Sequence, residues 1–292
     1  MTEDIHYTAP DGLKLFARAY GRESAPLNVL CMHGLTRNHK DFEPMIAALG
    51  DRWRFIAVDV RGRGRSAWDP DAGHYAPPVY VQDMKALLDH LGIERAALIG
   101  TSMGGLMAML MMKTMPERVA GVVLNDIGPA VDKAGLRRIG GYVGKSAAPV
   151  ADWESAARAV AAVQGPLFPG FTHDDWLDFA KRTFRQQDDG RLVLDYDPAI
   201  AASLGKVRAG PLMRFAMWRL FRAMSAAPLL VIRGQLSDIL GAKTVDKMLH
   251  QHPDASAVTV PNVGHAPVLN EPEALSAIAA FLQRIGPSTG QA

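Results

Sequence analysis

Short apolar runs rich in β-branched residues alternate with helix-like segments at both ends of the chain, and this alternation limits the fold most strongly. We expect strands at 5–8, 13–19, 28–32, 55–60, 96–99, 119–124, 229–232 and 257–260, and helices at 41–49, 79–91, 103–115, 243–250 and 273–285. Strands that alternate with helices form βαβ units and a parallel sheet. Only the first two strands, joined by the turn Pro10-Asp11-Gly12, are expected to be antiparallel. The sequence therefore predicts an α/β fold with a mostly parallel, eight-stranded sheet flanked by helices.

The middle of the chain has a different character. It contains helix-like segments with aromatic side chains and no convincing core strand; the aromatic residues are Trp153, Trp176, Phe179, Phe184, Trp218 and Phe221. We expect three parts: a first part of the core at 1–128, an inserted helical cap or lid at 129–227, and a second part of the core at 228–292.

Composition excludes several classes of function. The 292 residues are 48% apolar, which allows a sizeable core, and the net charge of +2 without a dense basic run argues against nucleic-acid binding. No charge-free apolar stretch of about 18 residues occurs, so no membrane span is expected. The first residues lack the pattern of a signal peptide, and the single Cys31 lies in an apolar run typical of a buried, reduced thiol. We expect a cytoplasmic protein.

A serine between glycines, in the stretch Gly100-Thr-Ser102-Met-Gly104-Gly105, lies between a predicted strand and a predicted helix. A strand that turns sharply into a helix strains the backbone of the serine and requires small residues two positions before and after it. The turn also exposes the hydroxyl at the carboxyl end of the sheet, where open α/β sheets bind ligands. The placement predicts that Ser102 is a nucleophile.

A serine hydroxyl needs a base within hydrogen-bond reach, and the base needs a third group that orients it. Of nine histidines, His265 is the best placed, in a loop after the last predicted strand. Two carboxylates follow predicted strands at their carboxyl ends. Asp238, which follows the first strand after the insertion, is the preferred acid. Asp126, which follows the last strand before it, is the alternative and is otherwise explained as a hydrogen-bonded turn residue.

Acyl transfer also requires two donors for the oxyanion that develops in the transition state. The backbone N–H of Met103, at the start of the helix, and that of Leu35, in the loop after an early strand, are the candidates. Gly34 would let this loop turn inward, and His33 is interpreted as a residue that orients it. No two histidines show metal-ligand spacing supported by further ligands, so no metal is expected.

Together these motifs resemble the α/β-hydrolase superfamily, in particular its esterase and enol-lactone hydrolase branch. The resemblance rests on His33-Gly34, Asp59-Val-Arg61-Gly62-Arg-Gly64-Arg-Ser66, Gly100-Thr-Ser102-Met-Gly104-Gly105, Gly234-Gln-Leu-Ser-Asp238 and Gly264-His265. They follow the family's order of nucleophile, acid and base. The resemblance covers about 200 residues at the two ends of the chain, and the middle corresponds to the variable helical cap. One departure is that the acid loop usually runs Gly-x-x-Asp, whereas here Ser237 intervenes before Asp238.

The resemblance implies hydrolysis of an ester or lactone. Relatives that open epoxides or displace halide carry an aspartate at the nucleophile position, so a serine favours acyl transfer to water through an acyl-enzyme. No cofactor is implied, and the expected partner is a small to medium apolar ester or lactone. Candidate pocket residues are Met213 and Trp218 in the predicted cap, together with His33 and Arg37. Arg37 could meet a substrate carboxylate, although a solvated charge is the preferred interpretation.

Two other functions remain open. A related serine enzyme could cleave a carbon–carbon bond in a ring-fission product, although that branch tends to carry a longer glycine-rich oxyanion motif than the HGLTRNH stretch at 33–39. The same scaffold could also serve as a small-molecule receptor, which has no need of a base. The sequence does not determine the oligomeric state, and a homodimer is compatible with it.

Overall fold

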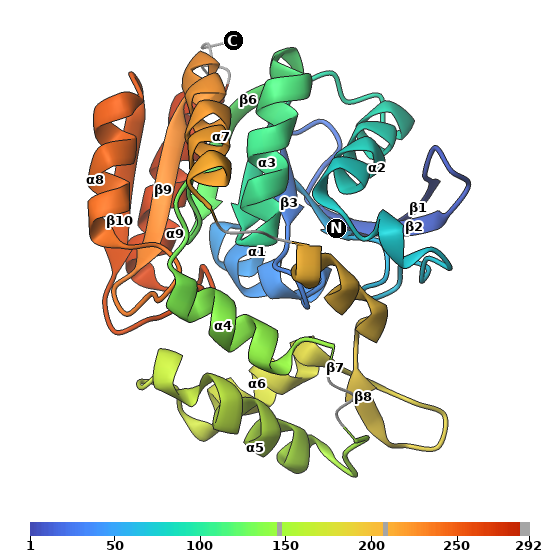
Figure 1. Ribbon diagram of the computed structural model, residues 1–292. Helices are drawn as coiled ribbons and strands as arrows, with labels where there is room; N and C mark the ends of the chain where they lie inside the picture. Colours follow the sequence, from blue (N-terminus) through green and yellow to red (C-terminus); the bar gives the residue numbers. More distant parts are fainter. Residues whose placement is uncertain (145–147, 207–209, 287–292) are drawn as a thin grey trace.

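An eight-stranded sheet runs through the centre of the computed structural model, which describes residues 1–144, 148–206 and 210–286 (Figure 1). The strand order is β1-β2-β4-β3-β5-β6-β9-β10. Strand β2 is antiparallel to both β1 and β4, and all other neighbouring pairs are parallel. The predicted fold class is therefore confirmed.

The bounds of the elements are close to those expected. The strands of the sheet are β1 Thr2–Thr8, β2 Lys14–Tyr20, β3 Asn28–Met32, β4 Arg54–Asp59, β5 Ala96–Thr101, β6 Val119–Asn125, β9 Leu229–Gly234 and β10 Ala255–Val260. The helices around it are α1 Glu43–Leu49, α2 Pro77–His90, α3 Met103–Thr114, α7 Pro211–Arg222, α8 Ala242–Gln251 and α9 Pro272–Ile285. Short 3-10 helices lie at His39–Phe42, Ala72–His74, Pro116–Arg118, Gly165–Leu167, Pro198–Lys206 and Ala223–Ala226.

Helices cover both faces of the sheet. The sequence of strand β3 illustrates how a strand is suited to burial on both faces. Successive side chains of a strand point to opposite faces. Val29 and Cys31 pack in the cluster that contains α1 and α9, whereas Leu30 and Met32 pack in the cluster that contains α2, α3, α7 and α8. A strand buried on both faces must be apolar throughout, which explains the unbroken Val-Leu-Cys-Met run. Burial raises the pKa of the Cys31 thiol and keeps it protonated.

Most of the middle segment forms a cap over the end of the sheet where β5 leads into α3 (Figure 1). The cap contains α4 Lys133–Tyr142, α5 Trp153–Gln164, α6 His173–Thr183 and a two-stranded hairpin, β7 Phe184–Gln186 with β8 Leu192–Leu194. The hairpin was not anticipated, because its strands have only three residues each. Helix α7, expected within the cap, lies along α3 in the core instead. In the described part of the chain, no helix is long and apolar enough to cross a membrane.

The glycines around Ser102 are required by backbone contacts. A Cβ added at Gly104 would overlap the carbonyl oxygen of Met32 on β3, and one added at Gly100 would overlap the carbonyl of Gly104. Neither neighbour is a flexible side chain that could move aside. The start of α3 can therefore approach β3 and β5 only because these positions lack a side chain.

We predict that Gly104→Ala destabilises the protein by about 2–3 kcal/mol, because the added methyl group meets backbone on the neighbouring strand. The midpoint of urea unfolding, followed by circular dichroism, measures this loss. Gly140→Ala is the matched control, because a Cβ at that exposed position of α4 meets nothing within 4 Å. The control should gain up to about 1 kcal/mol from helix propensity. Equal midpoints for the two variants would contradict the packing argument.

Candidate active site

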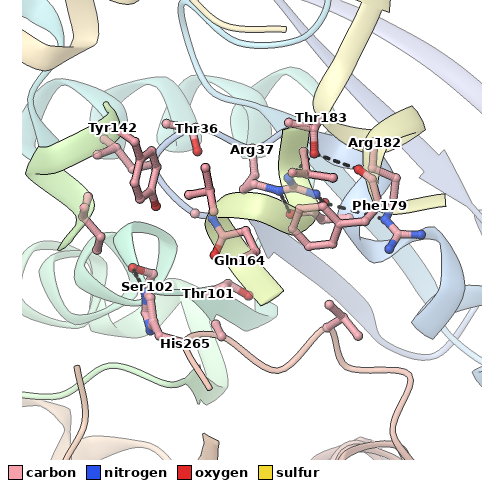
Figure 2. A pocket seen from close by; sticks show the side chains of 18 of the residues that line it. Thr36, Arg37, Thr101, Ser102, Tyr142, Gln164, Phe179, Arg182, Thr183 and His265 are labelled. Carbon is pink, nitrogen blue, oxygen red and sulfur yellow. Dashed lines mark hydrogen bonds and ion pairs between the residues drawn. The ribbon is translucent and has the colours of Figure 1, made fainter. Parts of the chain in front are cut away.

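Ser102 lies in the sharp turn between β5 and α3, with φ of 52° and ψ of −109°. Its backbone N–H donates to the carbonyl oxygen of Asn125 at 3.0 Å, which holds the turn against β6. The side chain points toward His265, and the distance from its Oγ to Nε2 of His265 is 2.9 Å (Figure 2). The strained backbone and the paired histidine are the two features expected of an activated serine.

The acid that contacts His265 is Asp126. Its Oδ2 lies 2.8 Å from Nδ1 of His265. Asp126 is completely buried, with φ of 55°, and its Oδ1 accepts a hydrogen bond from the backbone N–H of Gly234 at 2.9 Å. A buried carboxylate with these partners can fix the orientation of the imidazole and stabilise its protonated form. The alternative acid of the sequence analysis is thus the one that the structure brings to the histidine.

The prediction that Asp238 orients His265 is wrong. The Asp238 carboxylate forms a two-point ion pair with Arg138 of α4, at 2.7 and 2.8 Å. Arg138 lowers the pKa of this carboxyl group despite its partial burial. Asp238 therefore links the loop after β9 to the cap, and its oxygens are already bound to another partner.

Ser237 explains why the acid does not follow β9. It occupies the third position after Gly234, where the family motif Gly-x-x-Asp has its aspartate. Its Oγ donates to Oδ2 of Asp126 at 2.6 Å and accepts the backbone N–H groups of Ile239 and Leu240 at 3.1 and 3.0 Å. A hydroxyl at this position supports an acid that comes from β6. A serine in place of the aspartate at the motif position was therefore the feature of the sequence that indicated Asp126 as the acid.

Asn125 has a positioning role that the sequence analysis missed. Its Nδ2 donates to Oγ1 of Thr101 at 3.0 Å and to the carbonyl oxygen of Pro267 at 2.8 Å. It therefore joins the residue before Ser102 to the loop that carries His265. The only sequence signal was its position at the carboxyl end of β6, directly before Asp126.

Two backbone N–H groups lie free beside the serine. Within the described residues, neither the N–H of Leu35 nor that of Met103 donates a hydrogen bond. Both residues contact the fully buried Arg63, whose Nε donates to the carbonyl oxygen of Leu35 at 2.9 Å and whose Nη2 lies 3.7 Å from Sδ of Met103. These N–H groups can thus serve an oxyanion, as predicted, and Arg63 supports the loop that carries Leu35.

His33 also supports the loop that carries Leu35, and it does not line the cavity. Its Nε2 accepts the backbone N–H of Val60 at 3.0 Å, so Nδ1 carries the proton and donates to the carbonyl oxygen of Gly34 at 2.6 Å. Burial lowers the pKa of His33 to about 4, which keeps the ring neutral. This geometry agrees with the interpretation of His33 as a loop-orienting residue.

A cavity of about 390 Å³ opens in front of Ser102, between the sheet and the cap (Figure 2). Its walls are mainly apolar and include Ile139, Tyr142, Val160, Phe168, Phe179, Phe184 and Leu194. Trp218 and Met213, predicted to line the pocket, do not. Both lie on α7, where Trp218 packs against Phe221 in the core and Met213 is 46% exposed. The physical reason is that α7 packs along α3 and not over the cavity.

Arg37 lines the cavity, as the sequence analysis suggested, but it is not a solvated charge. Its Nε and Nη2 bind the two oxygens of Asp41 at 2.7 and 2.5 Å, and its Nη1 donates to Oγ1 of Thr183 at 2.5 Å. The guanidinium also lies over the ring of Phe179, 4.2 Å from the ring centre. Arg37 thus joins the segment after the oxyanion loop to α6 of the cap.

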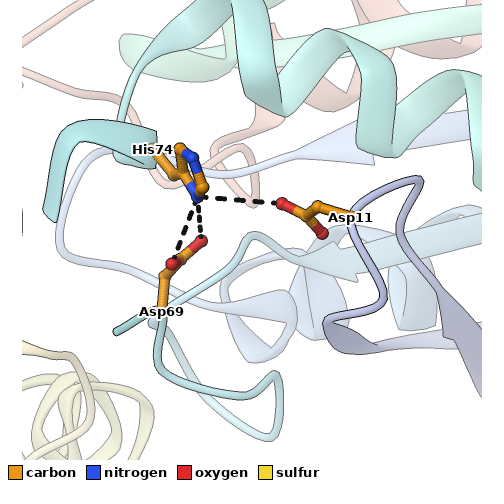
Figure 3. Close-up of side chains that lie close together, drawn as sticks. All are labelled: Asp11, Asp69 and His74. Carbon is orange, nitrogen blue, oxygen red and sulfur yellow. Dashed lines mark hydrogen bonds and ion pairs between the residues drawn. The ribbon is translucent and has the colours of Figure 1, made fainter. Parts of the chain in front are cut away.

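A separate cluster could offer ligands to a metal ion: Asp11, Asp69 and His74 (Figure 3). Nη1 of Arg61 donates to Asp11 at 2.7 Å and to Asp69 at 2.5 Å, and the rest of its guanidinium binds Asp83 at 2.6 and 2.8 Å. A buried cation already occupies the space between these carboxylates and would repel a metal ion. We interpret the cluster as an ion-pair network that fastens the β1–β2 turn to α2.

Comparisons with known proteins bear on the fold and the family of the chain. Residues 28–272 match the family model described as alpha/beta hydrolase fold. The chain is 36% identical to a 3-hydroxybutyrate-oligomer hydrolase of Cupriavidus necator, over 92% of each chain. It is 29% identical to a 2-(acetamidomethylene)succinate hydrolase of Mesorhizobium japonicum, over 83% of this chain and 82% of the other. The crystal structure of an alpha/beta hydrolase from Novosphingobium aromaticivorans superimposes with a TM-score of 0.90 at 44% identity, covering 97% of this chain and 98% of the other.

The two candidate acids can be separated by the reactivity of Ser102. We predict that Asp126→Asn slows phosphonylation of Ser102 by a fluorophosphonate about 10⁴-fold, because the amide favours the wrong tautomer of His265. Rates of labelling, followed by mass spectrometry, provide the measurement. Asp238→Asn is the matched control and should stay within a few-fold of wild type. A large loss in Asp238→Asn with little effect in Asp126→Asn would return the role to Asp238.

Proposed function

Because the chain belongs to the α/β-hydrolase family, we propose that it hydrolyses carboxylic esters through an acyl-enzyme on Ser102. One observation carries the proposal: a continuous hydrogen-bonded chain runs from buried Asp126 through both ring nitrogens of His265 to Oγ of Ser102. A small-molecule receptor does not require a serine that is bonded in this way to an oriented base.

The proposed reaction has two stages. Ser102 Oγ attacks the ester carbonyl while Nε2 of His265 takes its proton, and the imidazolium is stabilised by Asp126. The N–H groups of Leu35 and Met103 donate to the oxyanion. When the tetrahedral intermediate collapses, His265 protonates the leaving alcohol. A water molecule, deprotonated by His265, then attacks the acyl-enzyme; the second intermediate collapses, the acid leaves and His265 returns the proton to Ser102 Oγ.

The cavity supports substrates of modest size. Its 390 Å³ lies at the lower end of the range for small-molecule sites, and its apolar walls suit short acyl or alkyl groups. The relative from Cupriavidus necator is named for oligomers of 3-hydroxybutyrate. Such oligomers are hydroxy acids joined by ester bonds, so the name supports ester hydrolysis by this chain as well.

We predict that the protein hydrolyses short-chain p-nitrophenyl esters and that Ser102→Ala lowers kcat on the order of 10⁶-fold, or to the background rate. Release of p-nitrophenolate measures turnover, and labelling by a fluorophosphonate should map to the peptide that contains Ser102. A fold check by circular dichroism controls for misfolding. If the folded alanine variant keeps wild-type turnover, another residue is the nucleophile; if the wild type binds esters without turnover, the protein is a receptor.

A second prediction concerns hydroxy-acid oligomers. We expect the linear dimer and trimer of 3-hydroxybutyrate to be cleaved to the monomer, because each linkage is an ester within a short, mainly aliphatic chain. Chromatography of the products measures the reaction, with the Ser102→Ala variant as the control. Rapid hydrolysis of p-nitrophenyl butyrate or of a lactone, without cleavage of either oligomer, would exclude this substrate class.

A further inference from the structure

Two guanidinium groups line one part of the cavity, those of Arg37 and Arg182, and they share one carboxylate, Asp41. Arg37 binds both oxygens of Asp41 and also donates to Thr183. Burial would raise the pKa of Asp41, but the charge and hydrogen bonds of Arg37, together with the charge of Arg182, outweigh it and the pKa is lowered. Arg37 is therefore the hydrogen-bonded partner of this carboxylate, and Arg182 acts on it only through its charge.

Arg182 is left without a strong partner. Its nearest carboxylate oxygen is Oδ1 of Asp41, 4.0 Å from Nε, which is too far for a hydrogen bond. Among the described residues its guanidinium donates no hydrogen bond, and its nitrogens are not among the buried atoms sealed off from solvent. Only 15% of the side chain is exposed. Burial lowers the pKa of Arg182, and the nearby charge of Asp41 offsets this only in part.

The other carboxylates around Arg182 have cationic partners of their own. Asp195 lies 3.5 Å from Lys40 and 3.8 Å from Arg185, Asp178 lies 3.3 Å from Lys181, and Glu43 lies 3.7 Å from Arg18. Among the residues that the structure describes, the cavity lining therefore carries one unbalanced positive charge in a mainly apolar wall. A desolvated cation with free donors is costly unless a ligand pairs with it.

We propose that Arg182 binds a free carboxylate of the substrate, so that the enzyme acts on esters that carry a carboxylate at their far end. The inference rests on the proposed ester hydrolysis at Ser102. A guanidinium matches a carboxylate with two parallel hydrogen bonds and is the side chain best suited to this task. In Figure 2, Ser102 and His265 lie on one side of the cavity and Arg182 on the other, with Phe179 between them. The aliphatic part of the substrate would lie against this apolar surface.

The test compares matched anionic and neutral esters. One series has the carboxylate on the acyl side, mono-p-nitrophenyl glutarate against its methyl ester. The other has it on the alcohol side, O-butyryl-3-hydroxybutyrate against its methyl ester. We expect wild type to prefer the anionic member of at least one pair by about 10- to 100-fold in kcat/KM, mainly through KM, which is the size of a charge-assisted hydrogen-bonded pair.

In Arg182→Gln the ratio of anionic to neutral kcat/KM should fall toward one, and Arg182→Lys should restore part of it. Lys181→Gln is the matched control. It removes the same charge from the adjacent residue, but Lys181 is 57% exposed, pairs with Asp178 and does not line the cavity. This control should keep the wild-type ratio, which separates direct binding from a general effect of net charge.

Equal kcat/KM values for both members of both pairs in wild type would overturn the proposal, as would an unchanged ratio in Arg182→Gln. If Arg182→Gln does not fold, inhibition of neutral-ester hydrolysis by glutarate in wild type decides: competitive inhibition that weakens with salt supports the proposal, and no inhibition overturns it. Failure of the ester hydrolase function itself looks different, because wild type would then hydrolyse neither member of any pair.

Discussion

The close approach of α3 to the sheet is the constraint on which the rest of this structure depends. Gly104 touches the carbonyl of Met32 with no room for a side chain, so the helix begins directly against β3. The short turn that this contact requires places Ser102 at φ 52° and exposes its hydroxyl at the end of the sheet. The same turn leaves the N–H of Met103 free beside the reacting position. The contact between Gly104 and Met32 therefore determines both how α3 packs on the sheet and where the Ser102 hydroxyl lies.

The loops around this turn are held by buried polar groups as well as by apolar packing. Arg63 and neutral His33 fix the oxyanion loop through backbone carbonyl and N–H groups, and Asn125 joins the serine turn to the histidine loop. Each of these side chains is buried and donates at least one hydrogen bond, so a shift of one loop would leave further donors or acceptors unpaired. Such networks give a site a single geometry, which a nucleophile, base and acid must have before substrate binds.

The cap and the core contribute different side chains to the cavity. The core provides the serine, the base and the acid, whereas α6 provides a cation in an apolar wall. The shape and charge of the cavity therefore depend on a segment that is joined to the core by apolar packing and by polar contacts, among them the ion pair between Arg138 and Asp238. In the proposed function, the core therefore supplies the reacting groups and the cap supplies the cation proposed to select the substrate.

The sequence by itself determined the sheet, the order of its helices and the positions of Ser102 and His265, because apolar periodicity and glycine placement are local properties of the chain. It favoured Asp238 over Asp126 as the acid, which was wrong, because both follow strands at the same edge of the sheet and sequence alone does not show which one reaches the histidine. Only the tertiary structure decided between them, through the contact of Asp126 with His265 and the ion pair of Asp238 with Arg138. Only the tertiary structure shows that Trp218 packs in the core and that Arg182 lines the cavity, because the packing of α6 and α7 depends on contacts distant in sequence.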